Sequence, residues 1–145
     1  MEIYTIGFTQ TTAEHFFDRL THAKVQRLLD VRLKNTSQLA GFAKASDIEF
    51  FLERVAGISY QHEELLAPTE DLLGAYRKRE LDWPAYEDGF VELLAEREIQ
   101  NTLTVADFQA TTALLCSEAT AECCHRRLVC EYLAEYWSEL KAEHL

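Results

Sequence analysis

The chain has few basic residues, no long apolar run and no cysteine outside one short segment. Lysine and arginine number 14 against 25 aspartate and glutamate residues, which gives a formal net charge of −11. This charge repels a phosphate backbone, so we predict no broad nucleic-acid binding. The four cysteines lie between positions 116 and 130, whereas a disulfide framework joins distant parts of a fold. We therefore expect reduced thiols.

The N-terminal segment lacks the basic start and the apolar stretch of a signal peptide, and no apolar run approaches the length of a membrane span. We therefore expect a cytoplasmic protein with no membrane segment. The chain has 145 residues, of which 48% are hydrophobic, and is long enough to bury a core. We predict a single α/β domain over residues 1–145.

Short apolar strand patterns alternate with helical patterns along the sequence. The predicted strands cover residues 3–8, 27–32, 58–62, 112–116 and 140–145. Capping residues followed by apolar residues at helical spacing predict helices that begin near Thr11, Ser46, Thr69, Asp82 and Cys124. Such alternation is typical of parallel sheets. We predict a three-layer α/β/α fold with a mostly parallel sheet of about five strands.

Polar and reactive residues follow the ends of these strands. Gly7 ends the first strand, Asp30 and Arg32 the second, and Cys116 and Glu118 the fourth. Because they are charged, Asp30 and Arg32 are expected outside the core. The carboxyl ends of parallel strands meet at one edge, where ligands bind in such sheets. We therefore expect these residues to surround one cleft.

The helix after the fourth predicted strand opens with a thiol, an imidazole and a guanidinium group, in Cys124, His125 and Arg126. Unpaired N–H groups at a helix N-terminus attract anions and lower the pKa of a nearby thiol. Cys124 is therefore predicted to titrate below a free thiol and to be catalytic. We expect His125, Arg126 and Arg32 to bind a small anion such as a phosphate, a nucleotide-like group or a carboxylate.

Two other chemical interpretations use the same segment. In the first, Cys116 is the reactive thiol and Cys124 its resolving partner. In the second, Asp30 and Glu118 serve as acid and base without thiol chemistry, although salt bridges to nearby arginines explain these carboxylates equally well.

The sequence does not determine which histidine would act as the base for a catalytic cysteine. Neighbours on a helix do not face each other, so His62 or His144 competes with His125 for that role. A Cys-x5-Arg phosphatase loop is excluded, because Glu122 and Cys130 stand where arginine would be needed.

A metal site has weaker support. Acceptable zinc ligands are present in Cys116, Cys124, His125 and His144. No paired Cys-x2-Cys spacing accompanies them, and arginines beside the thiols repel a cation. We therefore predict no metal, and the sequence indicates no particular cofactor.

Several segments, in this order along the chain, resemble domain-of-unknown-function family 488. They are Thr5-Ile6-Gly7, Asp30-Val31-Arg32 with Ser37 and Phe42 after it, Gly57-Ile58-Ser59-Tyr60, Leu114-Leu115-Cys116-Ser117-Glu118, Cys124-His125-Arg126 and His144-Leu145. Phe8-Thr9 and Ala67-Pro68 stand where many members have His-Ser and Gly-Gly. The resemblance implies a small α/β cytoplasmic protein with an unassigned site, and it adds Ser37 to the ligand-binding candidates.

The sequence therefore favours an enzyme that acts on a small anionic molecule through a cysteine thiolate or an Asp/Glu pair. A ligand-binding module without turnover and a structural interaction module are the alternatives.

Overall fold

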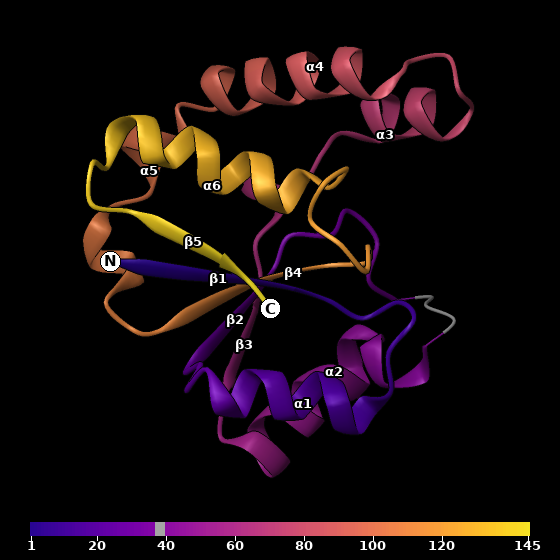
Figure 1. The fold of residues 1–145 in the computed structure, drawn as a ribbon. Coiled ribbons are helices and arrows are strands. Elements are labelled where there is room, and N and C mark those ends of the chain that lie inside the picture. The colour runs from indigo at the N-terminus through magenta and orange to yellow at the C-terminus, as the bar shows by residue number, and fades with distance from the viewer. Residues whose placement is uncertain (37–39) are drawn as a thin grey trace.

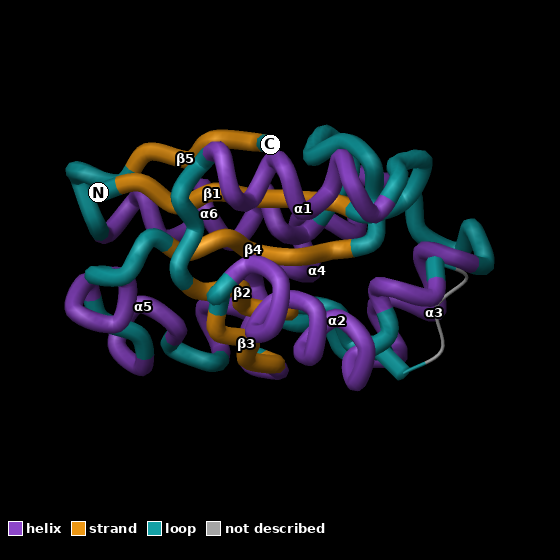
Figure 2. The backbone as a smooth tube through the Cα atoms, turned by 90° about the horizontal axis from the view of Figure 1, so that it is seen from below, coloured by secondary structure: helices purple, strands orange, loops and turns teal. Residues whose placement is uncertain are grey.

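The computed structural model of the chain describes residues 1–36 and 40–145 and contains a five-stranded sheet in which all paired strands are parallel. The strand order is β3-β2-β4-β1-β5, which can be followed from below in Figure 2. The strands are β1 (Glu2–Gly7), β2 (Arg27–Asp30), β3 (Ser59–His62), β4 (Thr112–Cys116) and β5 (Lys141–His144). The predicted α/β fold with a parallel sheet is confirmed.

Six α-helices occur in the described residues and lie on both sides of the sheet. They are α1 (Ala13–His22), α2 (Ala45–Phe51), α3 (Glu70–Arg77), α4 (Trp83–Glu96), α5 (Ile99–Thr102) and α6 (His125–Tyr136). A π-helical turn follows α2 at Leu52–Ala56, and 3-10 turns occupy Gly41–Ala43, Glu64–Leu66 and Val105–Phe108. Figure 1 shows α1 and α2 on one face of the sheet and the other four helices on the opposite side, which makes three layers.

Side chains that cap the helix N-termini explain where several helices begin. The hydroxyl groups of Thr12 and Thr69 accept hydrogen bonds from backbone N–H groups in the first turns of α1 and α3. The Asp82 carboxylate does the same for α4. The predicted starts at Thr69 and Asp82 are confirmed. The predicted cap at Ser46 is wrong, because Lys44 occupies the N-cap position of α2 without a side-chain bond.

The sheet buries a separate apolar core on each face, because successive side chains of a strand alternate between faces. The core beneath α4 and α6 contains Leu114 and Cys116 of β4. The core beneath α1 and α2 contains Leu115 of β4 and Leu28 of β2. Strand β4 is buried along its whole length, as expected for a central parallel strand.

The pairing register aligns the carboxyl ends of the three central strands. Gly7 of β1 pairs with Cys116 of β4, and Asp30 of β2 pairs with Leu115. The predicted gathering of these strand ends at one edge of the sheet is confirmed.

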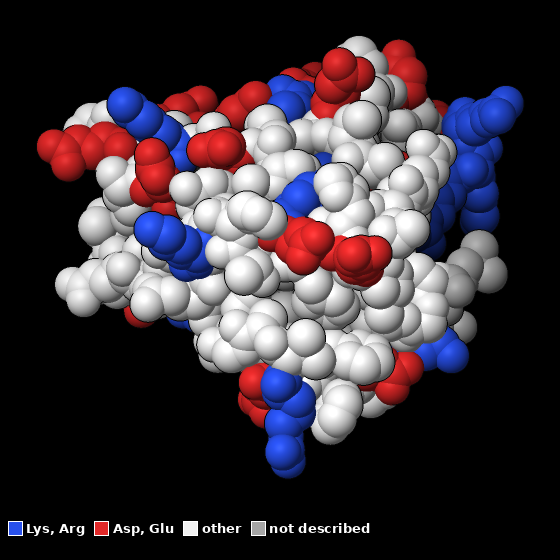
Figure 3. Space-filling model, turned by 60° about the horizontal axis from the view of Figure 1, so that its bottom comes forward, with Lys and Arg blue, Asp and Glu red and all other residues white. Residues whose placement is uncertain are grey.

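No helix among the described residues is both long and apolar enough to cross a membrane. The face in Figure 3, which lies toward α1 and α2, carries acidic and basic side chains interspersed with uncharged ones.

Candidate active site

The first two residues of α6 point to either side of β4. The imidazole of His125 reaches the end of β2, where Nε2 lies 2.8 Å from the carbonyl oxygen of Val31. The guanidinium group of Arg126 reaches β1, where Nε lies 3.3 Å from the Thr5 hydroxyl. Strand β4 lies between β2 and β1. The start of α6 therefore spans the end of β4, which carries Cys116.

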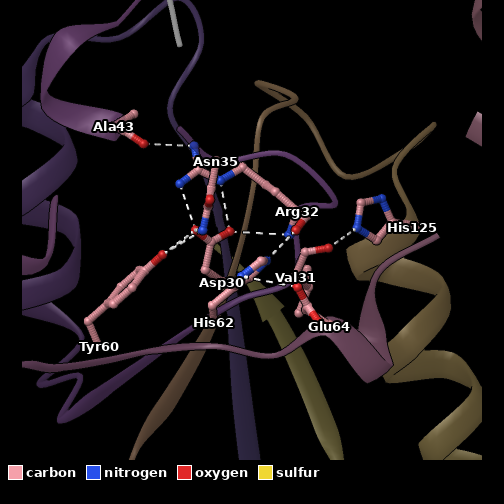
Figure 4. A network of polar contacts seen from close by, with 9 residues as sticks. All are labelled: Asp30, Val31, Arg32, Asn35, Ala43, Tyr60, His62, Glu64 and His125. Atoms are coloured by element: carbon pink, nitrogen blue, oxygen red, sulfur yellow. Dashed lines mark hydrogen bonds and ion pairs between the residues drawn. The ribbon is translucent and has the colours of Figure 1, made fainter. Parts of the chain in front are cut away.

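The contact with Val31 fixes the tautomer of His125. A carbonyl oxygen only accepts hydrogen bonds, so Nε2 carries the proton and donates it, as the dashed line in Figure 4 marks. Burial lowers the pKa of His125, so the ring is neutral at pH 7. Its Nδ1 therefore has a free lone pair, and it lies 3.7 Å from the Cys116 sulfur. Nδ1 is placed to accept the proton of that thiol.

Proton donors surround the Cys116 sulfur. The thiol of Cys124 donates a hydrogen bond to it, and this contact lowers the pKa of Cys116. Burial acts in the opposite direction, but the backbone N–H groups of Ser117 and Glu118 and the charge of Arg126 also lower the pKa. The Cys116 side chain is 6% exposed and lines a pocket. These effects together lower the pKa of the Cys116 thiol from its ordinary value.

The prediction that Cys124 has a lowered pKa is wrong. Cys124 occupies the N-cap position of α6, but its side chain makes no capping hydrogen bond. The hydrogen bond to Cys116 and the burial of its side chain, which is 2% exposed, both raise the pKa of Cys124. The sulfur faces another sulfur rather than the helix N–H groups. Cys124 therefore remains a protonated donor.

Arg126 is fully buried behind the two cysteines and does not line the pocket. Its Nη1 donates to the backbone carbonyl of Glu118 at 2.6 Å and lies 3.7 Å from the Cys124 sulfur. Gly7 permits this packing, since a Cβ there would meet the Glu118 carbonyl oxygen at 1.7 Å. Both residues shape the loop beside Cys116, and neither is placed to contact a ligand in the pocket.

Asp30 and Arg32 form a buried ion pair, drawn in Figure 4. Arg32 Nη2 lies 2.7 Å from Asp30 Oδ2, and Nε lies 2.8 Å from Oδ1. The Tyr60 hydroxyl donates to the same carboxylate at 2.6 Å, and the Asn35 amide donates at 3.2 Å. The remaining nitrogen of Arg32, Nη1, donates to the Ala43 carbonyl at 2.8 Å.

This network corrects two expectations for the charged end of β2. Burial alone would raise the pKa of Asp30, but the hydrogen bonds and charge of Arg32 outweigh it and lower the pKa. The carboxylate therefore stays ionised as an ion-pair partner, which does not suit an acid–base catalyst. Each nitrogen of the Arg32 guanidinium group already donates within the protein, and its charge is paired with Asp30 in a side chain that is 2% exposed, which disfavours a role in binding an anion. Pairing allows both charges to lie in the core, contrary to the prediction.

The prediction of one common cleft is also wrong for Asp30. Two residues before it on β2, Leu28 lies in the core beneath α1 and α2. Cys116 lies in the core beneath α4 and α6. The two side chains are at the same edge of the sheet but on opposite faces.

A pocket with a volume of about 110 Å³ opens beside Cys116. The predicted site residues that line it are Arg32, Cys116, Glu118, Cys124 and His125. Those that do not line it are Gly7, Asp30 and Arg126, while Ser37 lies outside the described residues. Arg126 contacts the backbone carbonyl of Glu118 and forms no ion pair with its carboxylate, so the salt bridge that is the alternative interpretation of Glu118 is not formed.

Sequence reasoning missed the wall that α3 and α4 contribute to this pocket. The wall includes a cluster of aromatic rings, in which Tyr86 lies 4.9 Å from Tyr76 and 5.3 Å from Trp83 between centroids. Arg77 adds a positive charge. The spacing of these aromatic residues along a helix is equally typical of core residues, and Arg77 carries no local signal.

The site also contains three residues that are chemically suitable as metal ligands. The ligand atoms of Cys116, Cys124 and His125 lie within 4.8 Å of one another. His125 donates its other ring N–H to a backbone carbonyl, as metal-bound histidines commonly do. The guanidinium group of Arg126 beside Cys124 opposes a divalent cation there.

Comparison with known proteins identifies a family. The family described as Domain of unknown function DUF488 matches residues 12–133. The match includes the Asp30-Val31-Arg32 and Cys124-His125-Arg126 segments and leaves out Thr5-Ile6-Gly7 and His144-Leu145. No curated protein and no solved structure matches the chain significantly. The chain belongs to the DUF488 family.

Proposed function

We propose that the chain is an enzyme that binds a small anionic molecule in the pocket beside β4 and attacks it with the Cys116 sulfur. The observation that most supports this proposal is that the Cys116 sulfur lies at the wall of the pocket, 3.7 Å from Nδ1 of His125. The Cys124 thiol and the backbone N–H groups of Ser117 and Glu118 also lower the pKa of Cys116. A catalytic thiolate needs such a positively polarised environment together with access to substrate.

The burial of Arg126 supports a negative charge at the same place. Its side chain is 0% exposed, and no carboxylate lies within ion-pair distance of it in the part of the chain described. An isolated buried charge is costly unless an opposite charge compensates it. Its charge lowers the pKa of Cys116. A Cys116 thiolate would therefore stabilise Arg126, just as Arg126 stabilises the thiolate.

His125 is the proposed proton acceptor. Its Nδ1 faces the Cys116 sulfur at 3.7 Å, and its donation to the Val31 carbonyl holds the ring in this orientation. The Cys116 sulfur, the His125 imidazole and the Val31 carbonyl thus form a chain of nucleophile, base and orienting acceptor, as in sites of covalent catalysis. Neither histidine that competes for this role, His62 or His144, lines the pocket.

The pocket favours a small molecule with an apolar or aromatic part and an anionic group. Tyr76, Trp83 and Tyr86 supply flat apolar surface, and Arg77 supplies a cation. Lys34 also lines the pocket and pairs with Glu70 at 2.5 Å. These features support a small anionic carboxylate or phosphate rather than a macromolecular substrate.

Alkylation of the folded protein tests the proposal. Rates of modification of each cysteine by iodoacetamide, measured by mass spectrometry from acidic to alkaline pH, should show Cys116 reacting at a lower pH than exposed Cys123. Cys130 is buried in the core, and burial raises its pKa to about 12, so it should stay unmodified until the protein unfolds.

A second comparison tests for the anion. Iodoacetate carries a negative charge and iodoacetamide does not, so the ratio of their rates at Cys116 reports local positive charge. An Arg77→Gln variant should lower this ratio at Cys116, with the Cys123→Ser variant as a control for alkylation at the neighbouring thiol. If Cys116 is modified only on unfolding, the proposed thiolate chemistry is wrong.

A further inference from the structure

We propose that Cys116 and Cys124 act as a dithiol that reduces small disulfides and closes to an intramolecular disulfide. This inference rests on the proposed function, because Cys116 is again the attacking sulfur, and it names the substrate as a low-molecular-weight disulfide with anionic groups. An attack on a carboxylate or phosphate derivative needs only one thiol. A second thiol in contact with the nucleophile is what exchange with a disulfide requires.

The geometry brings the two sulfurs together at the pocket. Cys116 ends β4 and Cys124 is the residue before α6, so a short loop joins them. Their sulfurs lie within 4.8 Å of each other, and both residues line the pocket. The backbone of Cys124 is extended, with φ −140° and ψ 134°, and its side chain takes no part in capping the helix. Its sulfur therefore lies beside that of Cys116 rather than against the N–H groups of the helix.

The two thiols differ in the way that sequential exchange needs. The pKa of Cys116 is lowered and that of Cys124 is raised. Cys116 lies at the pocket wall and is the more exposed of the two. The first attack would thus come from Cys116, and the second from the more deeply buried Cys124.

The exchange balances without any further reactant. The Cys116 thiolate attacks one sulfur of a disulfide R–S–S–R, the S–S bond breaks, and one RS⁻ leaves. The Cys116 proton, held on His125 Nδ1, passes to this first RS⁻ and frees Nδ1. Cys124 then gives its proton to Nδ1, and its sulfur attacks the Cys116 sulfur of the mixed disulfide. The second RS⁻ leaves and takes up the proton from His125. The two cysteines lose two electrons, and the substrate becomes two thiol molecules.

Charge favours this dithiol over a metal ion on the same atoms. One thiolate shared by the two sulfurs balances the buried charge of Arg126 and leaves the cluster neutral. A divalent cation held by two thiolates would leave the Arg126 charge uncompensated in a buried place. Arg126 Nη1 lies 3.7 Å from the Cys124 sulfur.

The test uses the full chain with Cys123→Ser, which removes the exposed neighbouring thiol. Dithiobis(nitrobenzoate), an aromatic disulfide with two carboxylates, releases a coloured thiolate with each exchange. We expect two equivalents of thiolate per chain, a protein mass lower by two hydrogen atoms, and a peptide map that joins Cys116 to Cys124. The Cys123→Ser/Cys124→Ala variant should release one equivalent and retain the reagent on Cys116.

The possible results separate this inference from the proposed function. A stable mixed disulfide on Cys116 in the Cys123→Ser protein would overturn the dithiol but leave the nucleophile in place. No reaction at Cys116 in any folded variant would overturn both. Metal bound to these sulfurs in the purified chain, with release of thiolate only after chelation, would also overturn the dithiol. If the Cys124→Ala variant does not fold, the mass and peptide map of the Cys123→Ser protein alone decide.

Discussion

Replacing Gly7 by alanine is the sharpest test of how the loop beside Cys116 is held. An added Cβ would lie 1.7 Å from the Glu118 carbonyl oxygen and 3.0 Å from Arg126 Nη1. Cβ atoms essentially never come closer than 3.0 Å to another heavy atom, so the loop backbone must move by more than an ångström. This carbonyl accepts a hydrogen bond from Arg126 at 2.6 Å, and that contact cannot survive such a shift.

The expected loss of stability has two parts. Overpacking in a close contact costs about 1–3 kcal/mol, and losing a hydrogen bond from a buried charged group costs about 1.5–3 kcal/mol. We expect Gly7→Ala to lower the free energy of unfolding by on the order of 3–5 kcal/mol, a large part of the roughly 5–15 kcal/mol of a typical domain. Urea unfolding followed by far-UV circular dichroism measures it.

Gly74→Ala is the matched control. Gly74 lies inside α3, and a Cβ there would meet nothing within 4 Å. Alanine in a helix interior is favoured over glycine, so this variant should gain about 0.5–1 kcal/mol. A Gly7→Ala protein as stable as the wild type would refute the close approach of Glu118. In the Gly7→Ala protein we also expect Cys116 to be alkylated only at a higher pH than in the wild type, because the N–H groups of Ser117 and Glu118, which lower its pKa, move with the loop.

Two further predictions concern the buried charges. Asp30→Asn should lower the free energy of unfolding by about 3–5 kcal/mol, because it leaves Arg32 buried and unpaired. The pKa of Asp30 is lower in the folded chain than in the unfolded chain. The stabilisation that ionised Asp30 provides is therefore present above the unfolded pKa of about 4 and is lost as the pH falls through the folded pKa. The free energies of unfolding of the wild type and of Asp30→Asn, measured in urea, should therefore converge at acidic pH. Arg126→Met should raise the pKa of Cys116 and slow its alkylation at pH 7 severalfold, and an unchanged pH profile would exclude Arg126 as the charge that stabilises the thiolate.

The order of strands and helices could be predicted because local signals agree with one another. The apolar run Thr112–Cys116 corresponds to β4. Thr69 and Asp82, whose side chains are typical of N-cap residues, cap α3 and α4 at the predicted positions. Parallel pairing then places the strand ends at one edge by topology alone. The edge that carries the site therefore follows from the sequence.

The sequence could not predict that the side chains of Asp30 and Cys116 lie on opposite faces of the sheet. Alternation tells which residues of one strand share a face, but comparing Asp30 with Cys116 requires the register between β2 and β4. That register is set by packing across the sheet: Asp30 pairs with Leu115, and Cys116 is the next residue along β4. A difference of one residue thus separates the ion pair from the thiol.

The properties of the two thiols depend on tertiary contacts that no local pattern contains. Near a helix N-terminus the sequence favours an anion at Cys124, yet the adjacent sulfur of Cys116 and burial reverse the direction of its pKa. The rings of Tyr76, Trp83 and Tyr86 enter the pocket from a helix pair far from Cys116 in the sequence. Local patterns identified the chemical groups, and packing decided their roles.

His125 and Arg126 are adjacent at the start of α6, and their proposed roles differ: His125 accepts a proton, and Arg126 supplies a positive charge. Consecutive helical side chains diverge by about 100°, so His125 turns toward β2 and Arg126 toward β1 while β4 lies between them. The neutral imidazole of His125 then lines the pocket beside the Cys116 sulfur, and the permanent charge of Arg126 is buried outside the pocket. With the charge outside the pocket, substrate binding would not compete with stabilisation of the thiolate. If a single arginine inside the pocket had to stabilise the thiolate and also bind an anionic substrate, it would have to exchange one for the other.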